Sequence, residues 1–229
     1  MGELTELEMS NEFDIALKKS SIKGIPSFEL LYKEVVCQQG IADFVGLTSN
    51  SFVKKYRFAD FTSNESCSLV LSCLKYKAGR SKNYLKKQTD LTDGTLNRVI
   101  RELVINKYAV EKNNLYYLAL PNIDAKDNTW AFELKLSNWK RAIFQALQYK
   151  AFANYSVVVF PFEKERILKE NMESFQELNI GVLLFSTEDH NTKWLYHPKK
   201  EKPISKWQTL FLLGQMSFQF SQENCIIQE

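Results

Sequence analysis

The sequence predicts a mixed α/β (α+β) fold, in which one mixed sheet flanked by helices is interrupted by an inserted segment. Three observations indicate it. Strand and helix patterns alternate after residue 129, which is typical of an α/β layer with at least partly parallel pairing. Two extended runs precede residue 50. Between these regions, short helical patterns and a hairpin pattern predict a segment that folds by itself.

The N-terminal region is expected to contribute a helix over residues 11–19 and two strands over residues 28–37 and 40–47. β-Branched and aromatic residues favour strands in both runs, and residues 38–40 are expected to form the turn between them. The second strand contains a single charge, Asp43, among apolar neighbours. A lone carboxylate in such a strand requires a partner or a metal ion.

Residues 51–125 resemble a winged helix-turn-helix. A helical pattern near Leu69 is followed by a short basic helix over residues 81–88, and Thr92 is the expected cap of a third helix. The apolar stripe of that third helix follows helical spacing through Leu96, Val99, Ile100, Leu103 and Val104. Asn113 and Asn114 then separate two short strands, and asparagine tolerates the positive φ of a tight hairpin.

The region after the insertion is expected to complete the sheet, so that residues 1–50 and 126–229 form one discontinuous domain. The predicted strands cover residues 130–136, 156–160 and 180–185, and the predicted helices cover residues 138–152 and 163–178. Residues 203–229 are partly helical in pattern. Alternation within the first of these strands places Glu133 and Lys135 on one face.

Basic charge is concentrated in the insertion. Between Lys54 and Lys112 there are 13 Lys and Arg against 6 Asp and Glu, a net charge of +7, which leaves −4 for the rest of a chain whose net charge is +3. Such a concentration is expected where a polyanion binds. The expected nucleic-acid contacts are Arg98, Arg101, Asn97, Lys82, Lys86 and Lys87. A solvated helix that mediates dimerisation would show the same pattern.

Several short motifs resemble those of the PD-(D/E)xK nuclease superfamily, which has a restriction-endonuclease-like fold. They are Glu34, Ile41-Ala42-Asp43, Glu133-Leu134-Lys135 and Trp139-x-x-Ala142-x-x-Gln145-x-x-x-Tyr149. The resemblance implies that three residues bind Mg²⁺ or Mn²⁺, namely Asp43, Glu133 and Leu134, the residue between Glu133 and Lys135. It also implies that Lys135 positions or activates the attacking water and that Gln145 orders the site. Glu34 would supply a third carboxylate.

The chain departs from the family pattern in two respects. Ala42 replaces the usual proline before the motif aspartate, and the inserted segment lengthens the separation between Asp43 and Glu133. Less specific interpretations stand beside the catalytic ones. Glu133 and Lys135 could form a charged strand edge, and Asp43 could cap a turn or pair with a lysine. Glu34 could be a solvated glutamate, and Glu12 competes with it for the role of third carboxylate. Trp139 and Tyr149 could simply pack in the core.

These observations predict a divalent-metal-dependent endonuclease that cuts DNA, acting in restriction or anti-phage defence. A non-catalytic nucleic-acid-binding or regulatory protein that retains the fold is the alternative, and an assembly subunit that contacts protein is a third. The expected partner is double-stranded DNA, with the chain acting as a homodimer or as a component of a larger defence complex.

Composition excludes other classes. No apolar run of roughly 18 residues and no secretory signal is present, so the sequence predicts a cytoplasmic protein with no membrane partner. The four cysteines form no Cys-x-x-Cys pair and the two histidines lie far from them in the sequence, which argues against a structural zinc site.

Overall fold

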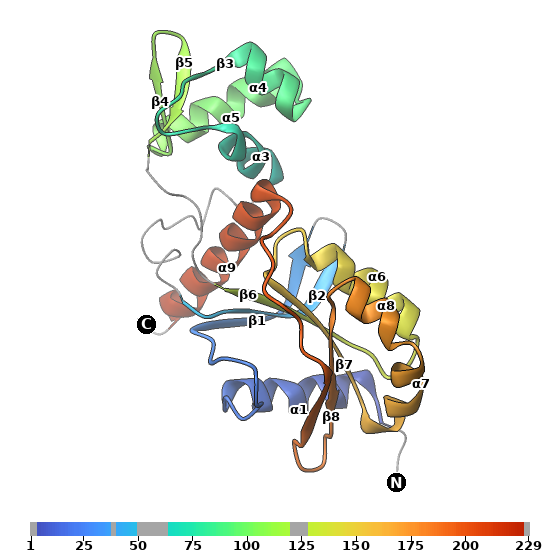
Figure 1. The fold of residues 1–229 in the computed structure, drawn as a ribbon. Coiled ribbons are helices and arrows are strands. Elements are labelled where there is room, and N and C mark those ends of the chain that lie inside the picture. Colours follow the sequence, from blue (N-terminus) through green and yellow to red (C-terminus); the bar gives the residue numbers. More distant parts are fainter. Residues whose placement is uncertain (1–3, 38–39, 50–63, 120–127, 227–229) are drawn as a thin grey trace. The chain divides into compact units, whose positions relative to one another are not determined.

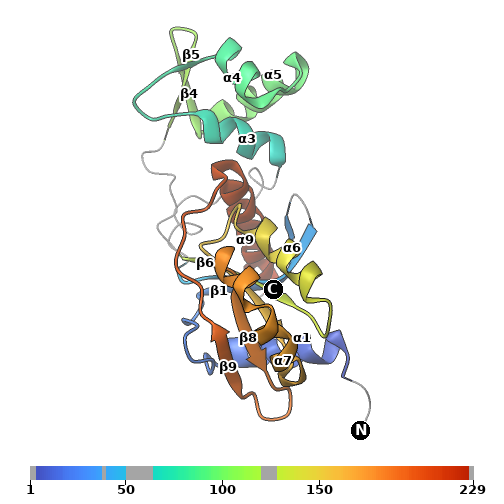
Figure 2. The ribbon, with the colours of Figure 1, turned by 45° about the vertical axis from the view of Figure 1, so that its right-hand side comes forward.

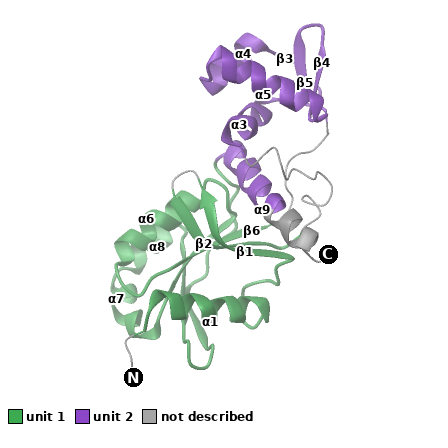
Figure 3. Cartoon of the chain, turned by 180° about the vertical axis from the view of Figure 1, so that it is seen from behind, with its two compact units in different colours: residues 1–51, 127–204 green, residues 52–126, 205–229 purple. Residues whose placement is uncertain are grey.

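The computed structural model describes residues 4–37, 40–49, 64–119 and 128–226. The chain divides into two compact units, which Figure 3 shows in different colours. Unit 1 comprises Met1–Ser51 and Asp127–Ile204, and unit 2 comprises Phe52–Lys126 and Ser205–Glu229. The predicted boundaries of the insertion lie within one residue of these divisions. The predicted grouping of the C-terminal segment is wrong, because residues 205–229 belong to unit 2.

A six-stranded mixed sheet forms the centre of unit 1, with strand order β1-β2-β6-β7-β8-β9 (Figure 1). The strands β6, β7 and β8 run parallel, and the other neighbours pair antiparallel. This arrangement confirms the predicted mixed α/β class and its partly parallel pairing. The strands are β1 (Leu30–Cys37), β2 (Gly40–Leu47), β6 (Thr129–Leu134), β7 (Tyr155–Phe160), β8 (Gly181–Phe185) and β9 (Thr192–Tyr196).

Helices cover both faces of this sheet, so each face has its own core (Figure 2). The helix α1 lies on one face, where the Phe13 ring packs edge-on against the ring of Phe44 at a centroid distance of 5.6 Å. On the other face Ala142 and Ala146 of α6 pack with Val158 of β7. The helices of unit 1 are α1 (Glu6–Lys18), α6 (Trp139–Tyr149), the 3-10 helix η1 (Phe162–Lys164), α7 (Glu165–Glu170) and α8 (Met172–Glu177).

Two helices of unit 1 differ from their predicted ranges. The helix α1 begins earlier than residue 11 because Thr5 and Glu8 form a capping box, in which the main-chain N–H of Glu8 donates to the Thr5 hydroxyl at 3.2 Å. The predicted single helix over residues 163–178 is instead η1, α7 and α8, which are interrupted at Asn171, where φ is −116°. The strand β6 ends at Leu134, two residues before the predicted end, β7 begins one residue earlier than predicted, and α6 lies within its predicted range of 138–152.

Within unit 1, β2 and β6 are paired as far as the residues that precede and follow the insertion in the sequence. Leu47, the last residue of β2, pairs with Thr129, the first residue of β6. Beyond that pair the main-chain N–H of Thr48 donates to the carbonyl of Asn128 at 3.2 Å. The residues of unit 1 that flank the insertion in the sequence therefore lie side by side.

Unit 2 contains helices and a small antiparallel sheet of order β3-β5-β4. Thr92 caps α5 by accepting the main-chain N–H of Thr95 at 3.2 Å, as predicted. Asn113 and Asn114 have φ values of 52° and 60°, which confirms the predicted hairpin turn. The elements are α3 (Glu65–Cys73), β3 (Arg80–Ser81), α4 (Lys82–Thr89), α5 (Asp93–Ile105), β4 (Ala109–Lys112), β5 (Leu115–Leu118) and α9 (Lys206–Ile226).

The C-terminal helix α9 explains the changed domain grouping. Its apolar residues from Leu210 to Leu213 are buried, and the helix packs against α3. Helical pattern alone could not show which unit would cover this face. Within the described residues, no helix is both long enough and apolar enough to cross a membrane.

Candidate active site

The pairing of β2 with β6 brings Asp43 opposite Glu133. The last pair of this antiparallel ladder is Phe44 with Phe132, so Asp43 and Glu133 occupy the next positions along the two strands. Phe44 and Phe132 belong to the core on the α1 side. Because side chains alternate along a strand, Asp43 and Glu133 both face the α6 side. The insertion therefore leaves these two residues adjacent in the sheet.

A hydrogen bond joins the two segments where the ladder ends. The main-chain N–H of Leu134 donates to Oδ2 of Asp43 at 2.7 Å. An aspartate side chain thus accepts a main-chain donor at the end of β6, which fixes its carboxylate beside the residues from Glu133 to Lys135. The structure thereby brings together the residues of the split site that the sequence predicts.

Glu133 is almost completely buried, with 1% of its surface exposed. Its Oε1 lies 2.8 Å from Nζ of Lys135, and its Oε2 contacts the hydroxyl of Tyr149. The Tyr149 hydroxyl also lies 3.0 Å from the carbonyl oxygen of Ile41. Tyr149 therefore ties α6 to both β2 and β6 beside the carboxylate, although its one hydroxyl proton can be donated fully to only one of the two oxygens.

Lys135 is held as an ammonium group by the carboxylates around it. Burial by itself lowers the pKa of this lysine, but the hydrogen bond and the charge of Glu133 act in the opposite direction. Asp43 and Glu6, whose Oε1 lies 4.0 Å from Nζ of Lys135, add to this effect, so the pKa is raised overall. A lysine that stays protonated stabilises negative charge rather than accepting a proton.

Asp43 is destabilised as a charged group. Burial and the negative charge of Glu133 raise its pKa to about 6, although the Leu134 N–H and Lys135 oppose the shift. One lysine does not compensate two carboxylates that lie in a partly desolvated site. A bound cation would relieve this repulsion, and a perturbed carboxylate of this kind is typical of a functional site.

The donor set fits a small hard cation. Asp43 and Glu133 provide carboxylate oxygens, which Mg²⁺ and Mn²⁺ prefer, and each oxygen retains lone pairs beyond the contacts already made. Among the residues that the structure describes, no group of three or more His, Cys, Asp or Glu side chains is able to hold a metal ion. Side-chain ligands would therefore be these two residues, with main-chain oxygen at Leu134 and water completing the shell.

Three other candidate acidic and polar residues lie on α6, β1 and α1. Gln145 lies on α6, half-buried, and its Oε1 is buried without a hydrogen-bond partner. Glu34 is exposed with φ of 51°, and the pairing of β1 with β2 passes over its position. Glu12 pairs with His190, whose Nε2 lies 2.8 Å from its carboxylate. The roles of Gln145 and Glu34 stay predictions, and Glu12 pairs away from the site.

Sequence reasoning missed two contacts of the site. Glu6 reaches Lys135 from the first turn of α1, and no sequence signal could place that helix end beside β6. Tyr149 belongs to the motif over residues 139–149, but the contact of its hydroxyl with Glu133 is not predicted by the sequence. The available signal was that a buried tyrosine hydroxyl usually has a polar partner.

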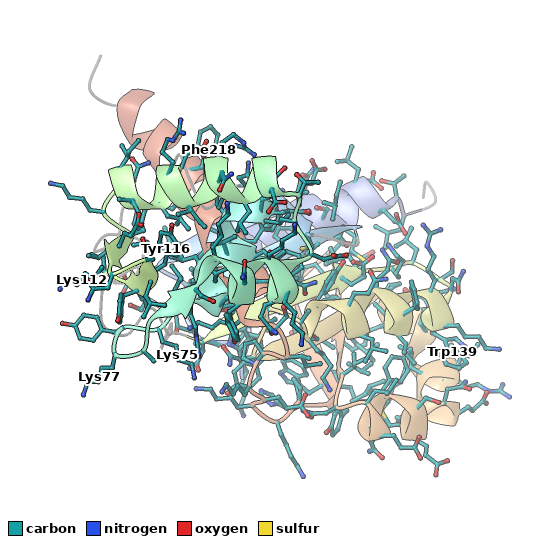
Figure 4. The ribbon with its side chains drawn as sticks, turned by 90° about the horizontal axis from the view of Figure 1, so that it is seen from above. Lys75, Lys77, Lys112, Tyr116, Trp139 and Phe218 are labelled. Atoms are coloured by element: carbon teal, nitrogen blue, oxygen red, sulfur yellow. The ribbon has the colours of Figure 1, made fainter. Side chains whose placement is uncertain are left out.

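In unit 2 the predicted amphipathic character of α5 is confirmed. Asn97, Arg98 and Arg101 are exposed, opposite the buried apolar stripe. Some of the basic charge on this unit is partly neutralised, because Arg98 pairs with Glu102 at 3.1 Å and Lys86 pairs with Asp93 at 2.6 Å. Lys87 is exposed and Lys82 is half-buried. Figure 4 shows further basic side chains of this unit, Lys75, Lys77 and Lys112, near Tyr116.

Comparisons of the chain with protein-family models, with curated proteins and with solved structures found no match. The geometry of Asp43, Glu133 and Lys135 therefore provides the main support for a function.

Proposed function

We propose that this protein is a divalent-metal-dependent nuclease of the PD-(D/E)xK type that hydrolyses phosphodiester bonds in DNA. The observation that supports this most directly is the hydrogen bond from Leu134 to Asp43 beside the buried Glu133–Lys135 pair. Two segments ninety residues apart thus meet as carboxylate, carboxylate and ammonium, which are the groups that phosphodiester hydrolysis requires.

Each residue has a distinct role in this proposal. Asp43 and Glu133, with the main-chain oxygen of Leu134, would hold Mg²⁺ or Mn²⁺, which supplies Lewis-acid charge neutralisation when bound. The Lys135 ammonium stabilises negative charge on the attacking water and on the phosphate as the transition state forms. Tyr149 positions Glu133 through the contact with its carboxylate.

Unit 2 would hold the DNA. Its three short helices and its hairpin resemble a winged helix-turn-helix, and the exposed Asn97, Arg98 and Arg101 of α5 are suited to phosphate or base-edge contacts. The concentration of basic residues in this part of the sequence supports the same assignment. A nuclease of this type fits restriction or anti-phage defence, acting as a homodimer or within a larger complex.

Cleavage of supercoiled and linear DNA in Mg²⁺ or Mn²⁺ tests the proposal when Lys135→Ala is compared with a matched variant, Lys150→Ala. Lys150 has a similar exposed fraction, 17% against 15% for Lys135, and it likewise pairs with a carboxylate, that of Glu201. We expect Lys135→Ala to cut at least about 100-fold more slowly, and Lys150→Ala to retain activity. Equal cutting by wild type and Lys135→Ala would remove Lys135 from the mechanism.

A non-catalytic DNA-binding or regulatory protein is the second candidate. It is favoured by the state of Glu133, whose two oxygens already contact Lys135 and Tyr149. This candidate predicts DNA binding that survives Asp43→Asn, with no cleavage in any metal. Calorimetric titration with Mg²⁺ separates the two, because only the nuclease predicts heat of binding that Asp43→Asn abolishes. Salt-independent or absent DNA affinity would instead favour the assembly subunit.

A further inference from the structure

A cavity of about 460 Å³ opens in unit 1 at the carboxyl ends of β6 and β7. It lies between the start of α6 and the helices η1 and α7. Its lining includes Ser137, Asn138, Trp139, Phe160, Lys164 and Ile167. The volume falls within the range of roughly 300–1,000 Å³ that is typical of small-ligand sites.

The cavity begins one strand away from Lys135. In the parallel pairing of β6 with β7, Leu134 lies opposite Val159, and the main-chain N–H of Lys135 donates to the Val159 carbonyl at 3.0 Å. The next position along β7 is Phe160, which lines the cavity. Adjacent strands lie about 4.8 Å apart, and these neighbouring positions face the same side of the sheet. The floor of the cavity at Phe160 therefore lies one strand away from the main chain of Lys135.

The lining suits a flat aromatic group, and its rim has charges of both signs, from Lys164 and Arg166 and from Glu163 and Glu170. Trp139 provides an aromatic wall, Ile167 adds an apolar surface that is 43% exposed, and Phe160, which is 1% exposed, lies at the floor. Figure 4 shows Trp139 at the N-terminal end of α6. Asn138 and Lys164 add polar groups at the same opening. Nucleobases pack favourably on aromatic side chains whatever their sequence, and a polar rim can bind their edges.

We propose that this cavity receives a nucleobase displaced from the duplex next to the phosphodiester that is cut. This inference rests on the proposed nuclease function and names its substrate class, namely DNA with an unpaired nucleotide beside the scissile phosphate. A base within an intact duplex cannot reach such a cavity without unstacking, and the cost of unstacking is least for a base that is already unpaired.

Fluorescence binding assays test the inference without requiring cleavage. The full-length chain in EDTA is titrated into duplexes in which 2-aminopurine is either fully paired or in a one-nucleotide bulge. We expect at least about fivefold tighter binding of the bulged duplex and a change in 2-aminopurine emission. Ile167→Glu should abolish both effects, because it places a charged carboxylate in the apolar wall of the cavity.

Controls keep the result interpretable. Phe144 lies on α6 as Trp139 does, is 62% exposed and does not line the cavity, so Phe144→Ala should keep the preference for the bulge. Trp139→Ala should behave as Ile167→Glu does, and thermal melting checks that it folds, since the Trp139 ring also packs against Phe175. Equal affinity for both duplexes, or a preference that survives Ile167→Glu, would overturn the inference.

Cleavage assays separate this inference from the proposed function. If the chain cuts paired and bulged duplexes equally in Mg²⁺, the nuclease function stands and the cavity inference falls. If no cleavage occurs but Ile167→Glu removes the bulge preference, the cavity binds an unpaired base, and the nuclease function falls together with the placement of that base beside a scissile phosphate. Free deoxyadenosine monophosphate is the last probe. If it binds wild type but not Ile167→Glu, and the wild type shows no bulge preference, the cavity serves a free nucleotide instead.

Discussion

In unit 1 two carboxylates and a lysine lie together in a buried or half-buried site at the end of β6, whereas in unit 2 the basic residues lie mostly exposed along α4 and α5. Glu133 is 1% exposed, while the side chain of Arg98 is 53% exposed and pairs with Glu102 one turn later. The same kinds of charged group therefore stand in opposite environments within one chain.

This difference in exposure determines how strongly the buried cluster of unit 1 and the basic face of unit 2 each indicate a function. Exposed ion pairs contribute about 0–1 kcal/mol to stability, and basic helix faces are common on soluble proteins. Two neighbouring carboxylates that are largely removed from water oppose folding, and the pKa of Asp43, raised to about 6, reflects that opposition. The buried cluster is thus the stronger argument for function, and the exposed face is supporting evidence that measurement must test.

The largest expected effect is on catalysis at the buried cluster. Glu133→Gln keeps the shape of the side chain but removes a metal ligand and the charge that pairs with Lys135, so we expect the rate of DNA cleavage to fall by about 100-fold or more. Glu12→Gln is the matched variant, because Glu12 also holds an ion pair, with His190, outside the site. A Glu133→Gln variant that cuts at the wild-type rate would show that Glu133 is structural.

A stability measurement tests the repulsion at Asp43 in the absence of divalent ions. Its pKa is about 6 in the folded protein against an ordinary value of 3.8, so between these values the folded state binds the proton more tightly than the unfolded state. The free energy of unfolding therefore falls as pH rises from about 4 to about 6, by at most about 3 kcal/mol.

Asp43→Asn should remove this loss. We expect the variant to be more stable than wild type at pH 7 and equal to it near pH 4, as measured by urea unfolding in EDTA. A variant that is less stable than wild type at pH 7 would mean that the Asp43 charge is compensated in the folded protein.

A smaller effect is expected at the tyrosine that contacts Glu133. Tyr149→Phe leaves buried acceptors without a donor and should lower the free energy of unfolding by about 1–2 kcal/mol. Tyr196→Phe is a matched variant. The Tyr196 hydroxyl donates to Oδ1 of Asn179 at 2.9 Å, and neither residue belongs to the cluster. Both should be destabilised, but only Tyr149→Phe should also slow cleavage. Equal activity of the two variants would limit Tyr149 to packing.

The smallest effect is expected on the exposed face of unit 2. Arg101→Ala should weaken DNA binding by about 1 kcal/mol at low salt and reduce the slope of log affinity against log salt by about 1, because one phosphate contact is lost. Lys18→Ala is the control, since the side chain of Lys18 is 63% exposed in unit 1 and does not line the cavity. Identical salt slopes for the two variants would place the DNA elsewhere.

The sequence was most informative for elements whose local residue pattern is enough to predict them. β-Branched and aromatic residues predicted the strand that holds Asp43, alternation predicted the shared face of Glu133 and Lys135, and helical spacing with a Thr92 cap predicted α5. Patterns were least informative where an element depends on a distant partner. The strand β9 is a partly exposed edge with little alternation, and α9 is apolar without any local sign that α3 covers it. The approach of Glu6 to Lys135 likewise depends on how α1 docks.

The pairing of the two strands that flank the insertion in the sequence has an evolutionary consequence. Thr48 and Asn128 are hydrogen-bonded, and Leu47 pairs with Thr129, so β2 and β6 meet as the two arms of an ordinary hairpin would. Asp43 and Glu133 lie at the opposite end of these arms. The segment between β2 and β6 can therefore be lengthened, shortened or exchanged during evolution. Such a change leaves the distance between the two carboxylates in the folded protein unaltered, because the strand pairing fixes it.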